Sequence, residues 1–255
     1  MALARRLLSH RLRRAMLAVG LGLMAAPGMA EIASARYTDE TSRYAHGVLG
    51  DAIEYGTLEL TLKDGKRLAL TLPQDRVFED IAPRLMDMDG DGVPEVIVVE
   101  SSQTGGARLA IYDETGLRAA TPHIGQRNRW LAPIGAADLD GAGHIEVAYI
   151  DRPHLAKTLR VWRFKDNQLT QVASQAGLTN HRIGEDFISG GIRDCGDDPE
   201  MITVNANWSE VMATRFDGQA LSPRALGGVQ NQATHKPPAA DTGPVTHTPA
   251  KNPGE

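Results

Sequence analysis

The sequence is poor in the features that mark a disulfide scaffold, a membrane-spanning protein or a helical fold. Cys195 is the single cysteine among 255 residues, so no intrachain disulfide can form. The apolar run at 15–26 has about 12 residues, whereas a helix that crosses a bilayer needs ~20. No later stretch repeats its apolar residues with the period of a helix. The sequence therefore predicts a fold without helices and without stable insertion into a membrane.

Catalytic motifs are absent as well. The chain has no Gly-x-Ser-x-Gly elbow, no phosphate-binding glycine loop and no cysteine–histidine context of the kind that nucleophilic enzymes use. Five histidines show neither the HxH nor the HExxH spacing of a zinc site. They are His46, His123, His144, His154 and His181. These absences favour a binding protein over an enzyme.

The first 30 residues have the composition of a signal peptide. A basic segment that includes Arg13 and Arg14 precedes the apolar run, and Gly28–Ala30 offers small residues for cleavage. We expect export to the periplasm or the cell exterior, by the general route or, given the arginine pair, by the twin-arginine route. Cleavage would remove five of the 27 basic residues and none of the 32 acidic ones, which leaves a net charge near −10. So acidic a chain is a poor candidate for nucleic-acid binding.

The most informative segment is an aspartate-rich loop that leads into the β-branched run 96–99. Asp87, Asp89 and Asp91 alternate at the first, third and fifth positions, and Gly92 stands at the turn. Ca²⁺ takes about six to eight oxygen ligands, and alternating carboxylates on a tight loop supply them. An EF-hand would need flanking helices and a later closing glutamate, so this loop is of another kind. The predicted ligands are Asp87, Asp89, Asp91, the Val93 carbonyl and Glu95.

The same pattern returns twice in weaker form. Asp138, Asp140 and Glu146 repeat it, with Ala142 at the fifth position. The third copy has lost the register, and a solvated turn is expected there; its acids are Asp194, Asp197, Asp198 and Glu200. The three closing glutamates are 51 and 54 residues apart. A period of this length is typical of stacked or radial repeats.

These loops resemble the FG-GAP/VCBS-type repeats of integrin-like β-propellers, over residues ~43–225. The interpretation of each cation is structural: a Ca²⁺ ion staples a blade at the first loop, and binds more weakly at the second. The resemblance also implies a binding or scaffold module whose loops meet a protein or carbohydrate partner.

Between the acidic loops, alternating apolar and polar residues predict β-hairpins. Turn residues separate the runs at 63–65, 113–116, 165–167 and 217–218. We predict an all-β chain that forms a small β-propeller of about four blades over 31–228, or a half-propeller completed by dimerisation. A β-sandwich would leave the repeat period unexplained. Residues 229–255, rich in proline and threonine, are expected to be a disordered tail.

A second repeat consists of arginines. Arg43, Arg76, Arg129 and Arg182 each open a unit, and the last three are 53 residues apart. In equivalent blade positions they would form a ring at one mouth of the propeller and bind carboxylate or phosphate groups. The alternative is that each pairs with an acid of its own repeat. Together with the pair Glu185–Asp186, such a ring would suit a ligand receptor or a hydrolase-like enzyme. This is the alternative to a binding or scaffold module.

Overall fold

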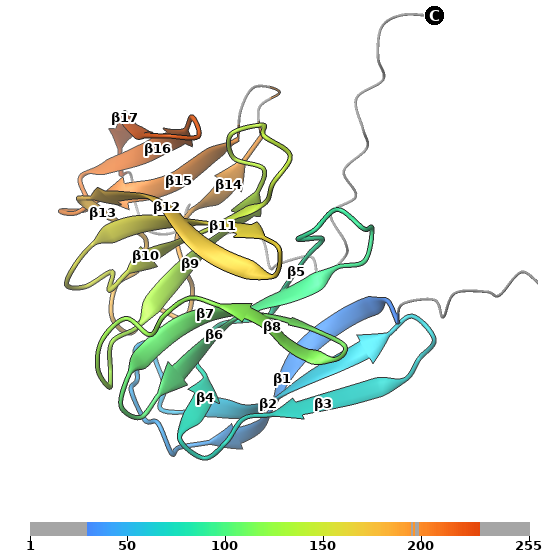
Figure 1. Cartoon of the computed structure of the whole chain (residues 1–255). Coiled ribbons are helices and arrows are strands. Elements are labelled where there is room, and N and C mark those ends of the chain that lie inside the picture. The colour runs from blue at the N-terminus through green and yellow to red at the C-terminus, as the bar shows by residue number, and fades with distance from the viewer. Residues whose placement is uncertain (1–29, 195, 197–198, 230–255) are drawn as a thin grey trace, which may run out of the picture.

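A computed structural model describes residues 30–194, 196 and 199–229. In this part of the chain every regular element is a β-strand, and the strands form three antiparallel sheets (Figure 1). The all-β prediction is confirmed. Among the described residues, no helix has the length and apolar character to cross a membrane. The predicted signal peptide (1–30) and tail (229–255) lie outside these residues, apart from Ala30 and Val229.

The first sheet joins an N-terminal three-stranded unit to the first acidic-loop unit. Its strands are β1 (Ile32–Thr41), β2 (Glu54–Leu62), β3 (Arg67–Thr71), β4 (Arg76–Phe78), β5 (Arg84–Met86), β6 (Glu95–Ser102), β7 (Gly106–Asp113) and β8 (Gly116–Ala120). In the N-terminal unit β2 pairs with β1 and β3, and the β2–β3 turn contains Gly65 at φ 85°. Glycine adopts this left-handed conformation without strain. β4 pairs with both β2 and β6 and so makes one sheet of the two units.

The second and third sheets repeat the strand order of the first acidic-loop unit. The second holds β9 (Leu131–Ala137), β10 (Glu146–Asp151), β11 (Thr158–Lys165) and β12 (Gln168–Ala176). The third holds β13 (Leu178–Thr179), β14 (Gly191–Arg193), β15 (Glu200–Asn205), β16 (Glu210–Phe216) and β17 (Leu221–Gly228). β5–β8, β9–β12 and β14–β17 are therefore three antiparallel meanders. The predicted turns join the last two strands of each.

Apolar side chains fill the spaces between successive units. One cluster packs Leu58 of β2 against Val98 of β6, and a second packs Leu109 of β7 against Leu131 of β9. A third lies between the second and third sheets and includes Phe216. Burying one such side chain contributes about 1.5–3 kcal/mol. Small antiparallel sheets packed one on the next in chain order are the architecture of a β-propeller, as predicted.

β6 takes part in two of these apolar clusters. All eight of its residues are buried. Neighbouring side chains of a strand point to opposite faces, so Val96 and Val98 enter one cluster while Ile97 and Val99 enter the other. The β-branched run 96–99 thus lies in a buried strand, and the closing glutamate of the first acidic loop is the first residue of that strand.

The N-terminal unit differs from the three meanders, because it has three strands and no acidic loop. The segment between its β1 and β2 reaches the third sheet, where the Gly184 amide donates to the Val48 carbonyl (3.0 Å). This bond links the first and last units of the described chain. Closure of the ring by one chain or by a dimer stays a prediction.

Candidate metal sites and the histidine cavity

The first acidic loop connects β5 to β6 and is folded around Asp87. The Asp87 carboxylate accepts hydrogen bonds from the amides of Gly90 (2.7 Å) and Gly92 (2.9 Å). Both glycines have positive φ, 80° and 86°, which a residue with a side chain rarely adopts. The glycines thus let the loop close tightly enough for its carboxylates to meet.

Glu95 ties this loop to β6. The Glu95 Oε2 accepts the Met88 amide (2.9 Å). One carboxylate oxygen each from Asp87, Asp89 and Glu95 lie within 4.8 Å of one another. Burial raises the pKa of Glu95 to about 7. Three oxygen donors on a tight loop suit a hard divalent cation. The predicted ligand Asp91 is not among these three; its carboxylate accepts the Val93 amide (2.7 Å).

The second acidic loop, between β9 and β10, has the same geometry. Oxygens of Asp138, Asp140 and Glu146 lie within 4.8 Å of one another, and Glu146 accepts the Leu139 amide (2.9 Å). Ala142 at the fifth position does not alter the cluster, since the fifth residue of the first loop also lies outside it. One Asp138 oxygen, Oδ1, is buried without a hydrogen-bond partner. A buried, unpartnered acceptor is costly unless a cation or water meets it.

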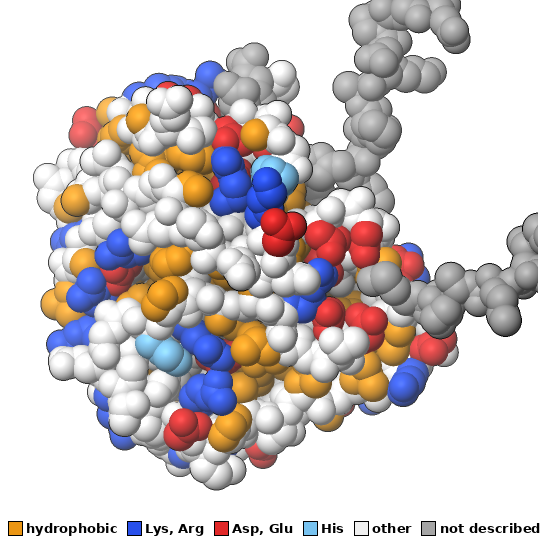
Figure 2. All heavy atoms as spheres, in the orientation of Figure 1, with side chains coloured by type: hydrophobic (Ala, Val, Ile, Leu, Met, Phe, Trp, Pro, Cys, Tyr) orange, Lys and Arg blue, Asp and Glu red, His pale blue; other side chains and the backbone are white. Residues whose placement is uncertain are grey.

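Each of these two clusters also holds one arginine that sequence reasoning missed. Arg118 of β8 donates to Asp89 (Nη2–Oδ2 2.9 Å) and to Glu95. Arg163 of β11 donates in the same way to Glu146 (Nε–Oε1 2.5 Å) and to Asp140. Arg163 is paired with Glu146 in the β10–β11 register. The register of the predicted hairpin could therefore have indicated this ion pair. Figure 2 shows acidic and basic side chains adjoining at the surface as well.

The third acidic loop is organised differently. Glu200 accepts hydrogen bonds from Arg193 (2.6 Å), Arg215 (3.0 Å) and Arg224 (2.8 Å). The bonds from Arg193 and then Arg224 lower the pKa of Glu200 to about 2. Asp194 accepts the Gly196 amide of its own turn (2.8 Å). Asp197 and Asp198 lie outside the described residues.

The four repeated arginines make different contacts, although Arg76 and Arg129 stand at matching positions, each two residues before the strand partner of Glu100 or Asp151. Arg76 opens β4, Arg129 precedes β9, and Arg182 lies between β13 and β14. The Arg43 guanidinium donates to the Arg76 carbonyl (Nη2–O 2.7 Å), and Arg76 pairs with buried Glu100 (Nη1–Oε2 3.2 Å). The structure thus brings Arg43 and Arg76 together, while Arg129 and Arg182 line separate cavities. Arg76 and Arg182 each pair with an acid of their own repeat, Glu100 and Glu185 (Arg182 Nη1–Glu185 Oε1 3.9 Å), as in the alternative interpretation. Arg43 donates to a backbone carbonyl instead.

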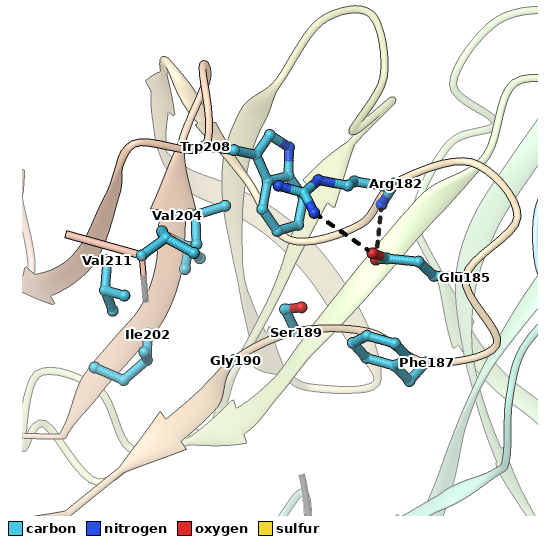
Figure 3. A pocket seen from close by; sticks show the side chains of 11 residues that line it. Arg182, Glu185, Phe187, Ser189, Gly190, Ile202, Val204, Trp208 and Val211 are labelled. Carbon is cyan, nitrogen blue, oxygen red and sulfur yellow. Dashed lines mark hydrogen bonds and ion pairs between the residues drawn. The ribbon is translucent and has the colours of Figure 1, made fainter. Parts of the chain in front are cut away.

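Arg182 and Glu185 line a cavity of about 40 Å³ in the third sheet (Figure 3). The Arg182 amide donates to Glu185 (N–Oε2 3.2 Å), and the Arg182 guanidinium lies 4.1 Å from the Trp208 ring centre. The remaining walls are mostly apolar. Pockets for small ligands usually enclose ~300–1,000 Å³, so this space is too small for one. Asp186 is exposed and does not line it.

A larger cavity, of about 300 Å³, is lined by loops of all three sheets, and we call it the histidine cavity. Its lining includes His46, Arg129, Trp130, Arg152, His154 and Ile183. His46 comes from the β1–β2 segment, residues 129–130 precede β9, His154 follows β10, and Ile183 follows β13. Because these residues are far apart in the sequence, their spacing gave no signal of a shared site.

Two hydrogen-bonded pairs hold the histidines of this cavity. His46 Nδ1 lies 2.6 Å from Oε1 of Glu79, which is buried. His154 Nε2 lies 3.0 Å from Nδ1 of His181, whose own Nε2 lies 3.0 Å from the Glu185 carbonyl. Burial, followed by the charges of His181 and His46, lowers the pKa of His154 to about 4. Burial also lowers the pKa of His181.

Comparisons with known proteins bear on the acidic loops. The model of the family described as FG-GAP-like repeat matches residues 87–149, a segment that spans the first two acidic loops. No curated protein sequence matches the chain significantly. Among solved structures, the chain is similar to the crystal structure of exotype rhamnogalacturonan lyase YesX, with 16% sequence identity and a TM-score of 0.44, over 78% of this chain and 48% of that one. The chain thus spans about half the length of that structure. With the three packed sheets, the family match identifies an all-β protein of the propeller type that carries an FG-GAP-like repeat at residues 87–149.

Proposed function

We propose that the chain is an exported β-propeller in which calcium ions staple the acidic-loop blades, and that it works as a binding or scaffold module. FG-GAP repeats are generally protein-interaction modules, and the match at residues 87–149 supports that broad role. The proposed setting, the periplasm or the cell exterior, combines this role with the signal-peptide composition of residues 1–30. The proposed partner is a protein or a carbohydrate that meets the loops of the propeller.

The observation that carries the calcium proposal is the charge balance of the first two clusters. Each joins three carboxylates to one guanidinium, which leaves a formal charge of −2 when all groups are ionised. One divalent cation would neutralise that charge. In the described part of the third unit, three arginines meet the single carboxylate of Glu200, and we propose no cation there.

Asp87, Asp89 and Glu95 would hold the ion of the first loop, with Asp91 and the Val93 carbonyl as outer ligands. Asp138, Asp140 and Glu146 would hold that of the second, where the unpartnered Asp138 oxygen is available. A bound ion supplies the positive charge that these carboxylates lack. The chain's own part is to fix the loop to the strand that follows it, through the glutamate at the start of β6 and of β10. Extracellular modules bind Ca²⁺ with a Kd of ~10⁻⁴–10⁻³ M, which suits such a structural ion.

Thermal unfolding of the full chain, with calcium and with chelator, tests this staple. An ion that binds the folded state alone stabilises it by about 2.7 kcal/mol at a hundredfold excess over Kd. Asp89→Ala and Asp140→Ala should each reduce the calcium shift, and the double variant should lose it. Asp64→Ala is the matched control, because Asp64 caps an exposed turn by accepting the Lys66 amide (2.9 Å). An unchanged melting curve of the wild type on chelation would refute the staple.

The binding role is tested separately, by affinity capture from an envelope extract. A partner of the proposed module should be retained by the wild type in calcium and by Asp64→Ala. It should be lost with chelator and with the Asp89→Ala/Asp140→Ala variant, because unstapled blades no longer hold their loops in place. Retention of the same partner under all four conditions would separate binding from the metal sites and refute their coupling.

A further inference from the structure

The histidine cavity has fixed donors and acceptors, and these define the ligand that would fit it. The site deepens the proposed binding function by giving it a ligand class, although it shares no residue with the acidic clusters. Its volume, about 300 Å³, is at the lower end of the range for pockets that enclose small molecules. Its polar groups come from rigid segments next to strands, so they are preorganised for recognition.

The tautomers of two histidines follow from their hydrogen bonds. The Glu185 carbonyl can only accept, so His181 must donate its Nε2–H to it (3.0 Å). A neutral His181 then has a lone pair on Nδ1, which accepts the Nε2–H of His154 (3.0 Å). His154, neutral as well because its pKa is lowered to about 4, keeps a lone pair on Nδ1. No side chain of the described residues bonds to that nitrogen, and the His154 ring lines the cavity. It is the acceptor that this ring leaves for a ligand.

Arg129 supplies the positive charge of the cavity. Its guanidinium donates to the Asn128 carbonyl (Nη1–O 3.2 Å) and has no carboxylate within 4.0 Å among the described residues. Arg152, which lines the same cavity, is already paired with Asp151 (Nε–Oδ1 2.7 Å). Guanidinium forks bind carboxylate groups bidentately. Arg129 therefore has free donors for an anionic group of a ligand.

The backbone that carries Arg129 is held on both sides. The Asn128 amide donates to the Tyr44 hydroxyl (2.7 Å), and the Arg129 carbonyl accepts the Ala107 amide (2.8 Å). Below it, the Trp130 indole N–H donates to the Glu79 carbonyl (2.9 Å). These bonds fix the position of the cation relative to the histidines, which reduces the ordering cost of binding.

We propose that the histidine cavity binds a small hydroxylated carboxylate. The carboxylate meets the Arg129 guanidinium, and a hydroxyl group donates its hydrogen to Nδ1 of His154. Leu155 and Ile183, 63% and 72% exposed, give the rim an apolar surface for the carbon chain of such a ligand. A carboxylate alone would leave the His154 acceptor unpaired, and a neutral polyol would leave the Arg129 charge unpaired.

The experiment is isothermal titration calorimetry on the full chain with three probes of similar size. Gluconate carries both groups, glucose carries hydroxyls only, and hexanoate carries a carboxylate only. We expect gluconate to bind at least tenfold more tightly than either of the others. Arg129→Gln should weaken gluconate binding at least tenfold, as the loss of a charged hydrogen bond does. Arg67→Gln, an exposed arginine of β3, should bind gluconate like the wild type.

The outcomes separate the parts of the proposal. Equal binding of hexanoate would overturn the role of His154, and equal binding of glucose with no effect of Arg129→Gln would overturn the role of Arg129. No binding of any probe at 10 mM concentration, on the order of a weak ligand's Kd, would overturn the site. His154→Phe adds a second test if its melting curve shows that it folds, and it should lose the preference for gluconate over hexanoate. If chelation left the melting curve unchanged, the calcium staple would be refuted. Gluconate binding to the same chelated protein would leave this site standing.

Discussion

Arg118 allows a sharp test of the idea that a guanidinium and a metal ion share one acidic cluster. Its side chain is 16% exposed and contacts both Asp89 and Glu95. Arg118→Gln leaves the carboxylates of the first loop without their cation. Removing one partner of a buried ion pair destabilises by about 3–5 kcal/mol, and the partial exposure here places the loss nearer 2–3 kcal/mol in chelator.

With calcium, most of that loss should be recovered, because the ion restores the missing charge. In the Arg118→Gln variant, calcium also has no guanidinium to compete with for the Asp89 carboxylate. We therefore expect its apparent Kd to fall about tenfold, which corresponds to about 1.4 kcal/mol of coupling. A part of the loss should persist, since Arg118 also donates to Asn167 (Nε–Oδ1 3.0 Å) on the neighbouring blade.

The assay is urea unfolding of the wild type and the variant, each with calcium and with chelator, so that the four free energies form a thermodynamic cycle. Arg67→Gln serves as the control, because its guanidinium is 67% exposed and lies 3.9 Å from Glu59. Its destabilisation should be below about 1 kcal/mol and independent of calcium. If Arg118→Gln lost the same free energy with and without calcium, the guanidinium and the ion would not share a site.

Three further predictions concern other parts of the chain. Glu54 is 3% exposed, and burial raises its pKa to about 9. The folded state therefore keeps the proton of this carboxyl, and the free energy of unfolding falls as pH rises from 4.5 towards 9. Glu54→Gln should be more stable than the wild type by up to about 3 kcal/mol at pH 7 but by little at pH 4. A difference between the two pH–stability curves that did not change with pH would contradict this. Glu200→Gln should destabilise equally with calcium and with chelator, unlike Asp89→Ala, because in the described part of the chain three arginines hold that carboxylate. Deletion of 230–255 should leave the melting temperature unchanged, since the segment lacks the apolar periodicity needed to dock; a drop of several degrees would indicate a strand.

Features that are local along the chain could be predicted from the sequence. The first acidic loop, the hairpin turns and the buried strand β6 each depend on residues within a short window. Weaker calcium binding at the second loop, because of Ala142, stays a prediction; its carboxylates form a cluster like that of the first loop. The reason is that Asp91, the fifth residue of the first loop, bonds to the amide of its own turn.

Features that depend on distant strands could not be predicted. Arg118 lies two strands away from Glu95, and the histidine cavity brings together loops of three sheets. The equal spacing of the arginines gave matching positions for Arg76 and Arg129 but not for Arg182, because the first strand of the third meander is built differently from β9. β9 is continuous, whereas the corresponding residues of the other units are divided into β4 and β5 or into β13 and β14.

The three-residue strand β4 has a consequence for how the repeats can be exchanged. Repeat proteins behave in general as rows of modules with nearest-neighbour interfaces. Here main-chain bonds of β4 cross the boundary between the first two units, so the amides of β2 and β6 should exchange with solvent in one cooperative opening. A chain cut before β5 would also leave residues 100–102 of β6 as an unpaired edge, open to association with other chains. Only the boundaries after β8 and β12, which no strand pairing of the described residues crosses, are suited to the removal or duplication of a unit.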